Sequence, residues 1–127
     1  MLRTGIDLVE INRLENLRPE IRERFLQRVF TPGELQDAHG SLQMLSGRFA
    51  AKEAVAKALQ TGIGPIGWQD IEIRKGTAGE PILTLHGAAQ ELAEGLGLVE
   101  WSVSISHTRQ YAVACVVALG KDRENRK

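Results

Sequence analysis

Residues Ser46 to Leu59 read S-G-R-F-A-A-K-E-A-V-A-K-A-L, and this stretch predicts the central helix of the fold. Ser46 is a good N-cap, and alanine, the best helix former, occurs five times in the next thirteen residues. At about 100° per residue, the apolar side chains share one arc; they are Ala51, Ala54, Val55, Ala58 and Leu59. We therefore expect a helix that lies close against the rest of the protein through small side chains.

Glu53 and Lys57 lie together on roughly the opposite side of this helix, one turn apart, with Phe49 beside them. An exposed pair of this kind contributes only a few tenths of a kcal/mol to stability and is common on protein surfaces. The alternative is that the pair belongs to a functional site. The helix alone does not decide between them.

The composition limits the classes of function. Sixteen basic and sixteen acidic side chains cancel, and aromatic residues make up 5% of the chain, which argues against nucleic acid as a partner. No leader-like or membrane-spanning run is present, so we expect no membrane association and a cytoplasmic location. The single cysteine, Cys115, fits a reducing compartment, and its apolar surroundings predict a place in the core.

The remaining elements follow from periodicity and turn residues. Before the central helix, the patterns predict a strand over Leu2–Glu10, helices over Ile11–Leu17 and Pro19–Phe30, a capping box at Thr31–Glu34 and a loop over His39–Leu45. After it, they predict strands over Trp68–Lys75 and Pro81–Leu85, a helix over Ala88–Leu98, and a hairpin with strands from Trp101 to Ser106 and from Tyr111 to Leu119. The last of these strands is predicted to be covered on both faces. This order predicts an α+β fold with a largely antiparallel sheet. We expect one domain over residues 1–120 and a charged tail over residues 121–127.

Asp7 is unusual in its predicted strand, because aspartate is disfavoured there and its apolar neighbours suggest burial. It either caps the following helix or serves a site, since a buried carboxylate needs a hydrogen bond, a cation or a metal. Asp7 and Glu53 together would form a minimal magnesium site, completed by substrate phosphates and water. Lys57 could then neutralise a phosphoryl oxygen.

Two further groups of basic residues could meet anions. Between Glu10 and Glu34 every basic residue is an arginine, which suits bidentate contacts with carboxylates or phosphates, although glutamates in the same segment also allow a solvated face of ion pairs. His107 follows a predicted strand beside hydroxyls and Arg109, where it either contacts an anion or is simply exposed in the turn.

Three motifs in register resemble a known family. They are G-I-D-L-V-E-I (Gly5–Ile11), G-R-F-A-A-K-E-A-V-A-K-A (Gly47–Ala58) and S-I-S-H-T (Ser104–Thr108), and they are similar to the motifs of the holo-acyl-carrier-protein synthases, the small bacterial 4′-phosphopantetheinyl transferases. The resemblance runs from about Thr4 to Leu119. It implies transfer of the phosphopantetheine arm of coenzyme A to a serine of apo acyl carrier protein, with Mg²⁺ as cofactor, in support of fatty acid biosynthesis.

The resemblance also implies roles for individual residues. Asp7 and Glu53 match the family's magnesium ligands, and Lys57 matches the lysine beside the reacting phosphate, so these three are the expected catalytic residues. The remaining matches are Arg48, His107 and Thr108 as coenzyme A contacts and Arg13, Arg24 and Arg28 as contacts of the carrier protein.

The family is typically homotrimeric, with its sites at subunit interfaces, and this implies a second copy of the chain as a partner. One departure is that Ser41–Ser46 lacks the basic residues that many members carry there. A competing hypothesis is a non-catalytic module that docks an acidic protein through the arginine face.

Overall fold

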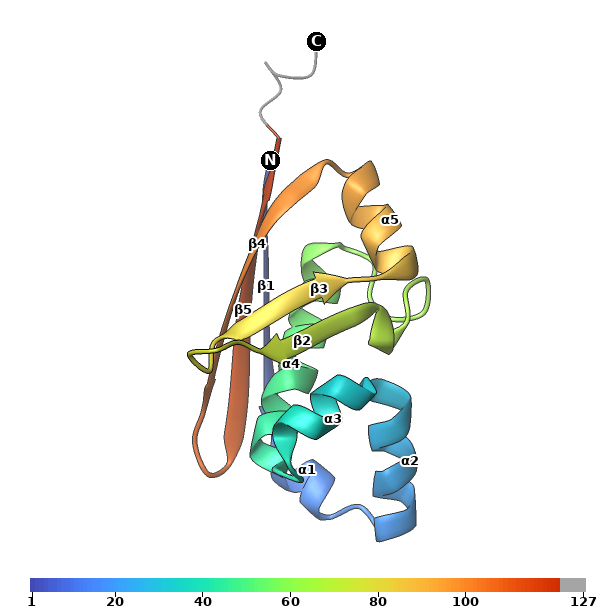
Figure 1. The fold of residues 1–127 in the computed structure, drawn as a ribbon, viewed down its shortest axis with the longest axis vertical. Helices are drawn as coiled ribbons and strands as arrows, with labels where there is room; N and C mark the ends of the chain where they lie inside the picture. Colours follow the sequence, from blue (N-terminus) through green and yellow to red (C-terminus); the bar gives the residue numbers. More distant parts are fainter. Residues whose placement is uncertain (122–127) are drawn as a thin grey trace.

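The structure, a computed structural model, describes residues 1–121; the predicted tail lies outside this range from residue 122 onward. Its elements in chain order are β1 (Leu2–Glu10), α1 (Asn12–Glu15), α2 (Pro19–Val29), α3 (Pro32–Ala38), α4 (Leu42–Ala58), the 3₁₀ turn η1 (Trp68–Asp70), β2 (Ile71–Lys75), β3 (Pro81–Leu85), α5 (Gly87–Gly95), β4 (Leu98–His107) and β5 (Tyr111–Gly120) (Figure 1). None of the helices among these residues is long and apolar enough to span a bilayer.

The strands form two antiparallel sheets. The larger has the order β1-β5-β4, and the smaller is the β2-β3 hairpin. The predicted α+β class and antiparallel pairing are therefore confirmed, with two sheets instead of one. The helices and the β2-β3 hairpin all lie on one side of the larger sheet, which Figure 1 shows nearly edge-on at the left.

Helix α4 packs directly on the larger sheet. Its predicted apolar arc is buried, and it faces the inward side chains of β5, which are Ala112, Ala114, Val116 and Ala118. The approach is closest at Gly5 of β1, where an added Cβ would lie 1.9 Å from the carbonyl oxygen of Ala54. Only glycine fits there, because the two backbones are in contact.

Several predicted boundaries are corrected by the structure. Helix α4 begins at Leu42 and not after Ser46, because Ser41 accepts a hydrogen bond from the Met44 amide at 3.1 Å; the predicted loop over His39–Leu45 is thus largely helical. Trp68–Asp70 is a 3₁₀ turn and not strand, because Asp70 accepts from the Gly67 amide at 2.9 Å.

At the other helix ends the predictions were closer. The capping box is confirmed, since the Thr31 hydroxyl accepts from the Glu34 amide and the Glu34 side chain accepts from the Thr31 amide. Helix α5 ends at Gly95 and not at Leu98, because Gly97 adopts a left-handed φ of 75° and the chain turns into β4. The other helices agree to within two residues.

The outer face of the larger sheet has no covering element among the described residues. Strand β5 is central, as predicted, but only its inner face is covered. Cys115 is exposed and not in the core, because the odd-numbered side chains of β5 point outward. Large apolar side chains accompany it on this outer face; those of Leu2, Ile6 and Leu8 from β1 and of Tyr111, Val117 and Leu119 from β5 are exposed.

A buried ion pair joins α4 to α3. Lys52 and Glu34 lie 2.8 Å apart with fully buried side chains. The Lys52 ammonium also donates to the carbonyls of Trp68 and Ile71, and Glu34 accepts from the Ile73 amide. Burial lowers the pKa of Lys52, and Glu34 opposes this effect. With these hydrogen bonds the pair is satisfied, as burial of two charges requires.

The contact at Gly5 yields a first prediction. Gly5→Ala should lower the free energy of unfolding by about 3 kcal/mol, the upper end for overpacking, because the new methyl group must push α4 away from β1. Urea unfolding at neutral pH measures this. Gly95→Ala is the matched control, since nothing lies within 4 Å of a Cβ at that position. Equal stability of Gly5→Ala and wild type would contradict the proposed backbone contact.

Candidate active site

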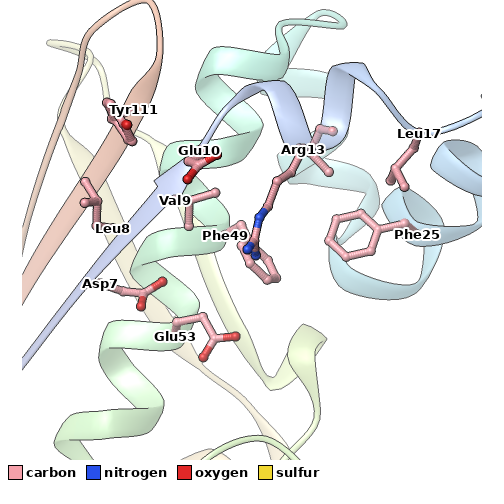
Figure 2. A pocket seen from close by; sticks show the side chains of 11 residues that line it. Asp7, Leu8, Val9, Glu10, Arg13, Leu17, Phe25, Phe49, Glu53 and Tyr111 are labelled. Atoms are coloured by element: carbon pink, nitrogen blue, oxygen red, sulfur yellow. The ribbon is translucent and has the colours of Figure 1, made fainter.

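The site begins with the alternation of β1. Gly5, Asp7 and Val9 share the inner face of the strand, so the Asp7 carboxylate points toward α4 just beyond the contact at Gly5. On α4, Glu53 directly precedes Ala54, the residue in contact with Gly5. The close approach of the two backbones thus places Asp7 beside Glu53, and Figure 2 shows the two carboxylates extending into the same space.

Lys57 is paired with Asp7 and not with Glu53. Its ammonium lies 3.1 Å from Oδ1 of Asp7 and donates to the Ile6 carbonyl at 2.9 Å. The expected ion pair within the helix is therefore replaced by one between α4 and β1. Asp7 lies in the middle of its strand and does not cap the next helix; its side chain is 20% exposed, so it is partly and not fully buried.

The electrostatics of the site are those of two neighbouring carboxylates. Burial raises the pKa of Glu53, and the negative charge of Asp7 raises it further, while Lys57 acts in the opposite direction. A divalent cation would relieve this repulsion, and carboxylate oxygens are the ligands that Mg²⁺ prefers. Among residues 1–121 no three His, Cys, Asp or Glu side chains gather as a metal site. Two carboxylates still fit Mg²⁺ in particular, because it usually takes its other ligands from phosphates and water.

A cavity of about 580 Å³ opens beside the two carboxylates. Apolar side chains from β1, α1, α2 and α4 form much of its wall; they are Val9, Leu14, Leu17, Phe25 and Phe49. The ring of Phe49 also packs at a tilt against those of Phe25 and Trp68, with ring centroids 5.5 Å and 5.1 Å away. Arg13 extends into the cavity in Figure 2, so it can bring a positive charge to a bound group.

The other expected coenzyme A contacts lie elsewhere in the chain. Arg48 is about 140° from Glu53 around α4, and it is buried beside the acidic residues of α3. Burial lowers the pKa of Arg48, while Glu34 and Asp37 oppose this. His107 ends β4 and lies across β5 from Val9, so about 10 Å separates their backbones. The Thr108 hydroxyl accepts from the amides of Gln110 and Tyr111 in the hairpin turn.

Two of the three arginines of α2, Arg24 and Arg28, are exposed, whereas Arg22 is half-buried and donates to the carbonyls of Leu14 and Glu15. Among the described residues from Glu10 to Glu34, one arginine forms an ion pair. It is Arg18, which lies 3.6 Å from Glu20. The segment is therefore not the network of ion pairs that its glutamates allowed, and the guanidinium groups of Arg24 and Arg28 are available to a partner.

Two features of the site were missed from the sequence. One is the aromatic wall of Phe25 and Phe49. The other is buried Lys52, although a signal for it existed: Lys52, Val55 and Leu59 follow the i, i+3, i+7 spacing of one helix face, so Lys52 belongs to an apolar stripe. A lysine there requires a buried acid, and the Glu34 capping box offered one.

Comparisons with known proteins agree with this architecture. The model of the 4′-phosphopantetheinyl transferase superfamily matches residues 3–116. A holo-[acyl-carrier-protein] synthase of Herpetosiphon aurantiacus is 46% identical over 94% of this chain and 100% of its own, and one of Moorella thermoacetica is 48% identical over 90% and 91%. The crystal structure of the Helicobacter pylori holo-[acyl-carrier-protein] synthase in complex with coenzyme A superposes with a TM-score of 0.82 at 36% identity, covering 91% of this chain and 99% of that one.

The fold and the site thus define a transferase of the phosphopantetheinyl class. The chain belongs to the 4′-phosphopantetheinyl transferase superfamily and, within it, to the holo-[acyl-carrier-protein] synthase family. The resemblance of the three sequence motifs is confirmed over nearly the whole chain.

The raised pKa of Glu53, caused first by burial and then by the charge of Asp7, yields a second prediction. Because the folded state raises the pKa of Glu53, its ionised form destabilises the fold at any pH above its unfolded value. Glu53→Gln should therefore raise the melting temperature at pH 7, and the gain should vanish near pH 3, where Glu53 is protonated in both states. Thermal unfolding at the two pH values checks this. A less stable variant at pH 7 would contradict the raised pKa of Glu53.

Proposed function

We propose that the chain transfers the 4′-phosphopantetheine group of coenzyme A to a serine of apo acyl carrier protein in a magnesium-dependent reaction. The products are holo acyl carrier protein and adenosine 3′,5′-bisphosphate, and the reaction serves fatty acid biosynthesis in the cytoplasm. The observation that carries the proposal is the meeting of Asp7 and Glu53 at one cavity, with Lys57 paired to Asp7, in a chain of this family. The Helicobacter pylori relative binds coenzyme A.

Asp7 and Glu53 would hold the Mg²⁺ ion. When bound, the ion would neutralise negative charge on the pyrophosphate of coenzyme A. The support is the pair of adjacent carboxylates described above. Their placement on two packed elements favours a fixed site, because neither β1 nor α4 can move without opening the contact at Gly5.

Lys57 would act on the reacting phosphate. In the transfer, the serine hydroxyl loses its proton to solvent and its oxygen forms a bond to the phosphorus of the pantetheine phosphate. The bond from that phosphorus to the bridging oxygen breaks. The bisphosphate then leaves with additional negative charge. An ammonium group at this point stabilises that charge. Lys57 is suited to this role because its side chain is 55% exposed and its stem is flexible.

The assembly would be a homotrimer with each site shared between neighbours. One support is the uncovered outer face of the larger sheet, since exposed apolar patches of this kind mark interaction surfaces. The other is the separation of Arg48, His107 and Thr108 from the two carboxylates within one chain. A neighbouring copy could bring its own His107 and Thr108 to coenzyme A, and closed rotational symmetry would make the sites equivalent.

The carrier protein would dock through Arg13, Arg24 and Arg28. The two arginines on α2 are exposed and lack described ion pairs, and Arg13 extends into the cavity beside Glu53. Together they would place a positive surface next to the reacting phosphate, where an acidic segment of the carrier can bind.

The transfer itself is the third prediction. Incubation with coenzyme A, Mg²⁺ and apo acyl carrier protein should add the phosphopantetheine mass to the carrier, measured by mass spectrometry. Asp7→Ala and Glu53→Ala should abolish the transfer without unfolding the protein, and Lys57→Ala should slow it by about 10²–10³-fold. Arg24→Glu should raise the KM for the carrier at unchanged kcat, and Lys75→Glu on β2 is the charge-matched control.

A carrier that gains no mass under these conditions would refute the transfer. If it nevertheless binds the protein without Mg²⁺ or coenzyme A, the chain is a docking module and not the proposed enzyme. A fully active Asp7→Ala, Glu53→Ala double variant would remove the metal role from these two residues.

The assembly is the fourth prediction. Sedimentation should give the mass of three chains for the wild type. Val117→Asp, in the middle of the outer face, should give single chains and lose the transfer activity, because a charge cannot be buried there without a partner. Ile82→Asp is the matched control, since Ile82 is similarly exposed on β3, outside this face. Trimeric Val117→Asp would place the interface elsewhere.

A further inference from the structure

The ammonium group of Lys57 contacts Asp7, one of the two proposed ligands of the divalent cation. It lies 3.1 Å from one carboxylate oxygen of Asp7 and is anchored by the Ile6 carbonyl at 2.9 Å. Both partners belong to β1, so the side chain reaches from α4 across to the strand. Without substrate, the negative charge of Asp7 is therefore already balanced by a group of the protein itself.

The charges around Asp7 determine how the Lys57–Asp7 pair affects the binding of a cation. Burial and then the negative charge of Asp7 raise the pKa of Glu53, and the positive charge of Lys57 opposes this. Of the other charged residues that line the cavity, Glu10 adds a negative and Arg13 a positive charge. A divalent cation that enters the site thus meets the ammonium of Lys57 as a competitor at Asp7.

We propose that Lys57 is an internal competitor of the divalent cation, which holds Asp7 until a phosphate-bearing substrate draws the ammonium away. The inference rests on the proposed function and deepens it. Lys57 can exchange partners, because its side chain is flexible and more than half exposed. Asp7, in contrast, is held in a strand. A phosphate oxygen near Glu53 offers the ammonium a new partner and frees the oxygen of Asp7.

A consequence is that cation and substrate bind cooperatively. Substrate that attracts Lys57 raises the affinity of the site for the cation, and by linkage the cation raises the affinity for substrate by the same factor. The protein would then bind the cation weakly on its own and strongly together with coenzyme A. This arrangement balances the negative charge of Asp7 in the resting protein without a bound metal.

The test measures binding of Mn²⁺, a paramagnetic substitute for Mg²⁺, without any turnover. Electron paramagnetic resonance counts the free ion during a titration of the intact protein at one pH near neutrality. Lys57→Met should bind Mn²⁺ about tenfold more tightly than wild type in the absence of coenzyme A, because one positive charge beside Asp7 is gone. Coenzyme A should then strengthen Mn²⁺ binding less in the variant than in wild type.

Three matched variants control this experiment. Lys57→Gln is also neutral but can still donate to the Ile6 carbonyl, and it should bind Mn²⁺ as tightly as Lys57→Met. Lys57→Arg keeps the charge and should resemble wild type. Lys75→Met removes the same charge from exposed Lys75 on β2 and should leave Mn²⁺ binding unchanged. Circular dichroism confirms that each variant is folded.

Equal or weaker Mn²⁺ binding by folded Lys57→Met would overturn the inference, and so would tight binding by Lys57→Arg. Failure of the proposed function is distinguishable from this. If the wild type transfers nothing to the carrier but the variants show the expected Mn²⁺ affinities, the proposed function is wrong and the competition at Asp7 stands. If the wild type is active but substitution of Lys57 does not change Mn²⁺ binding, the proposed function stands and the competition is wrong.

Discussion

The contact between Gly5 of β1 and the backbone of Ala54 on α4 is the constraint on which the rest of the molecule depends. Glycine on the strand and alanine on the helix let the two backbones touch. The approach sets the height of α4 over the larger sheet and buries its apolar arc against β5. It also brings Asp7, two residues along the strand, beside Glu53, the neighbour of Ala54. The tight packing and the site thus share one cause.

Helix α4 has a different task on each of its faces. The alanine face contacts the sheet, the face with Glu53 and Lys57 meets β1 and the cavity, and the face with Arg48 and Lys52 turns toward α3 and β2. The ion pair of Lys52 with Glu34 connects the face that carries Lys52 to α3. Because its charges are fully buried, it tolerates little displacement, and the helix is held from both sides.

The outer face of the larger sheet and the scattered coenzyme A contacts have a common explanation in the proposed assembly. A three-stranded sheet with helices on one side exposes its other side, and in this chain β1 and β5 carry large apolar side chains there. Alone, the chain presents two carboxylates, a lysine and one wall of a cavity. A second copy that covers the outer face would bury its apolar side chains, and it could supply the histidine that lies too far away within one chain.

The sequence by itself determined the fold class, the order of the elements, the family and the identity of Asp7, Glu53 and Lys57 as candidate site residues. Helix propensity, alternation and capping are local, and the three motifs lie within short stretches of chain, so one-dimensional information suffices for them. The sequence did not predict the contact of Lys57 with Asp7, the ion pair of Lys52 with Glu34 or the exposure of Cys115. Those outcomes depend on which elements meet, and on which face of a sheet is covered. The tertiary structure alone decided them, because contact between residues 50 positions apart is set by packing and not by local pattern.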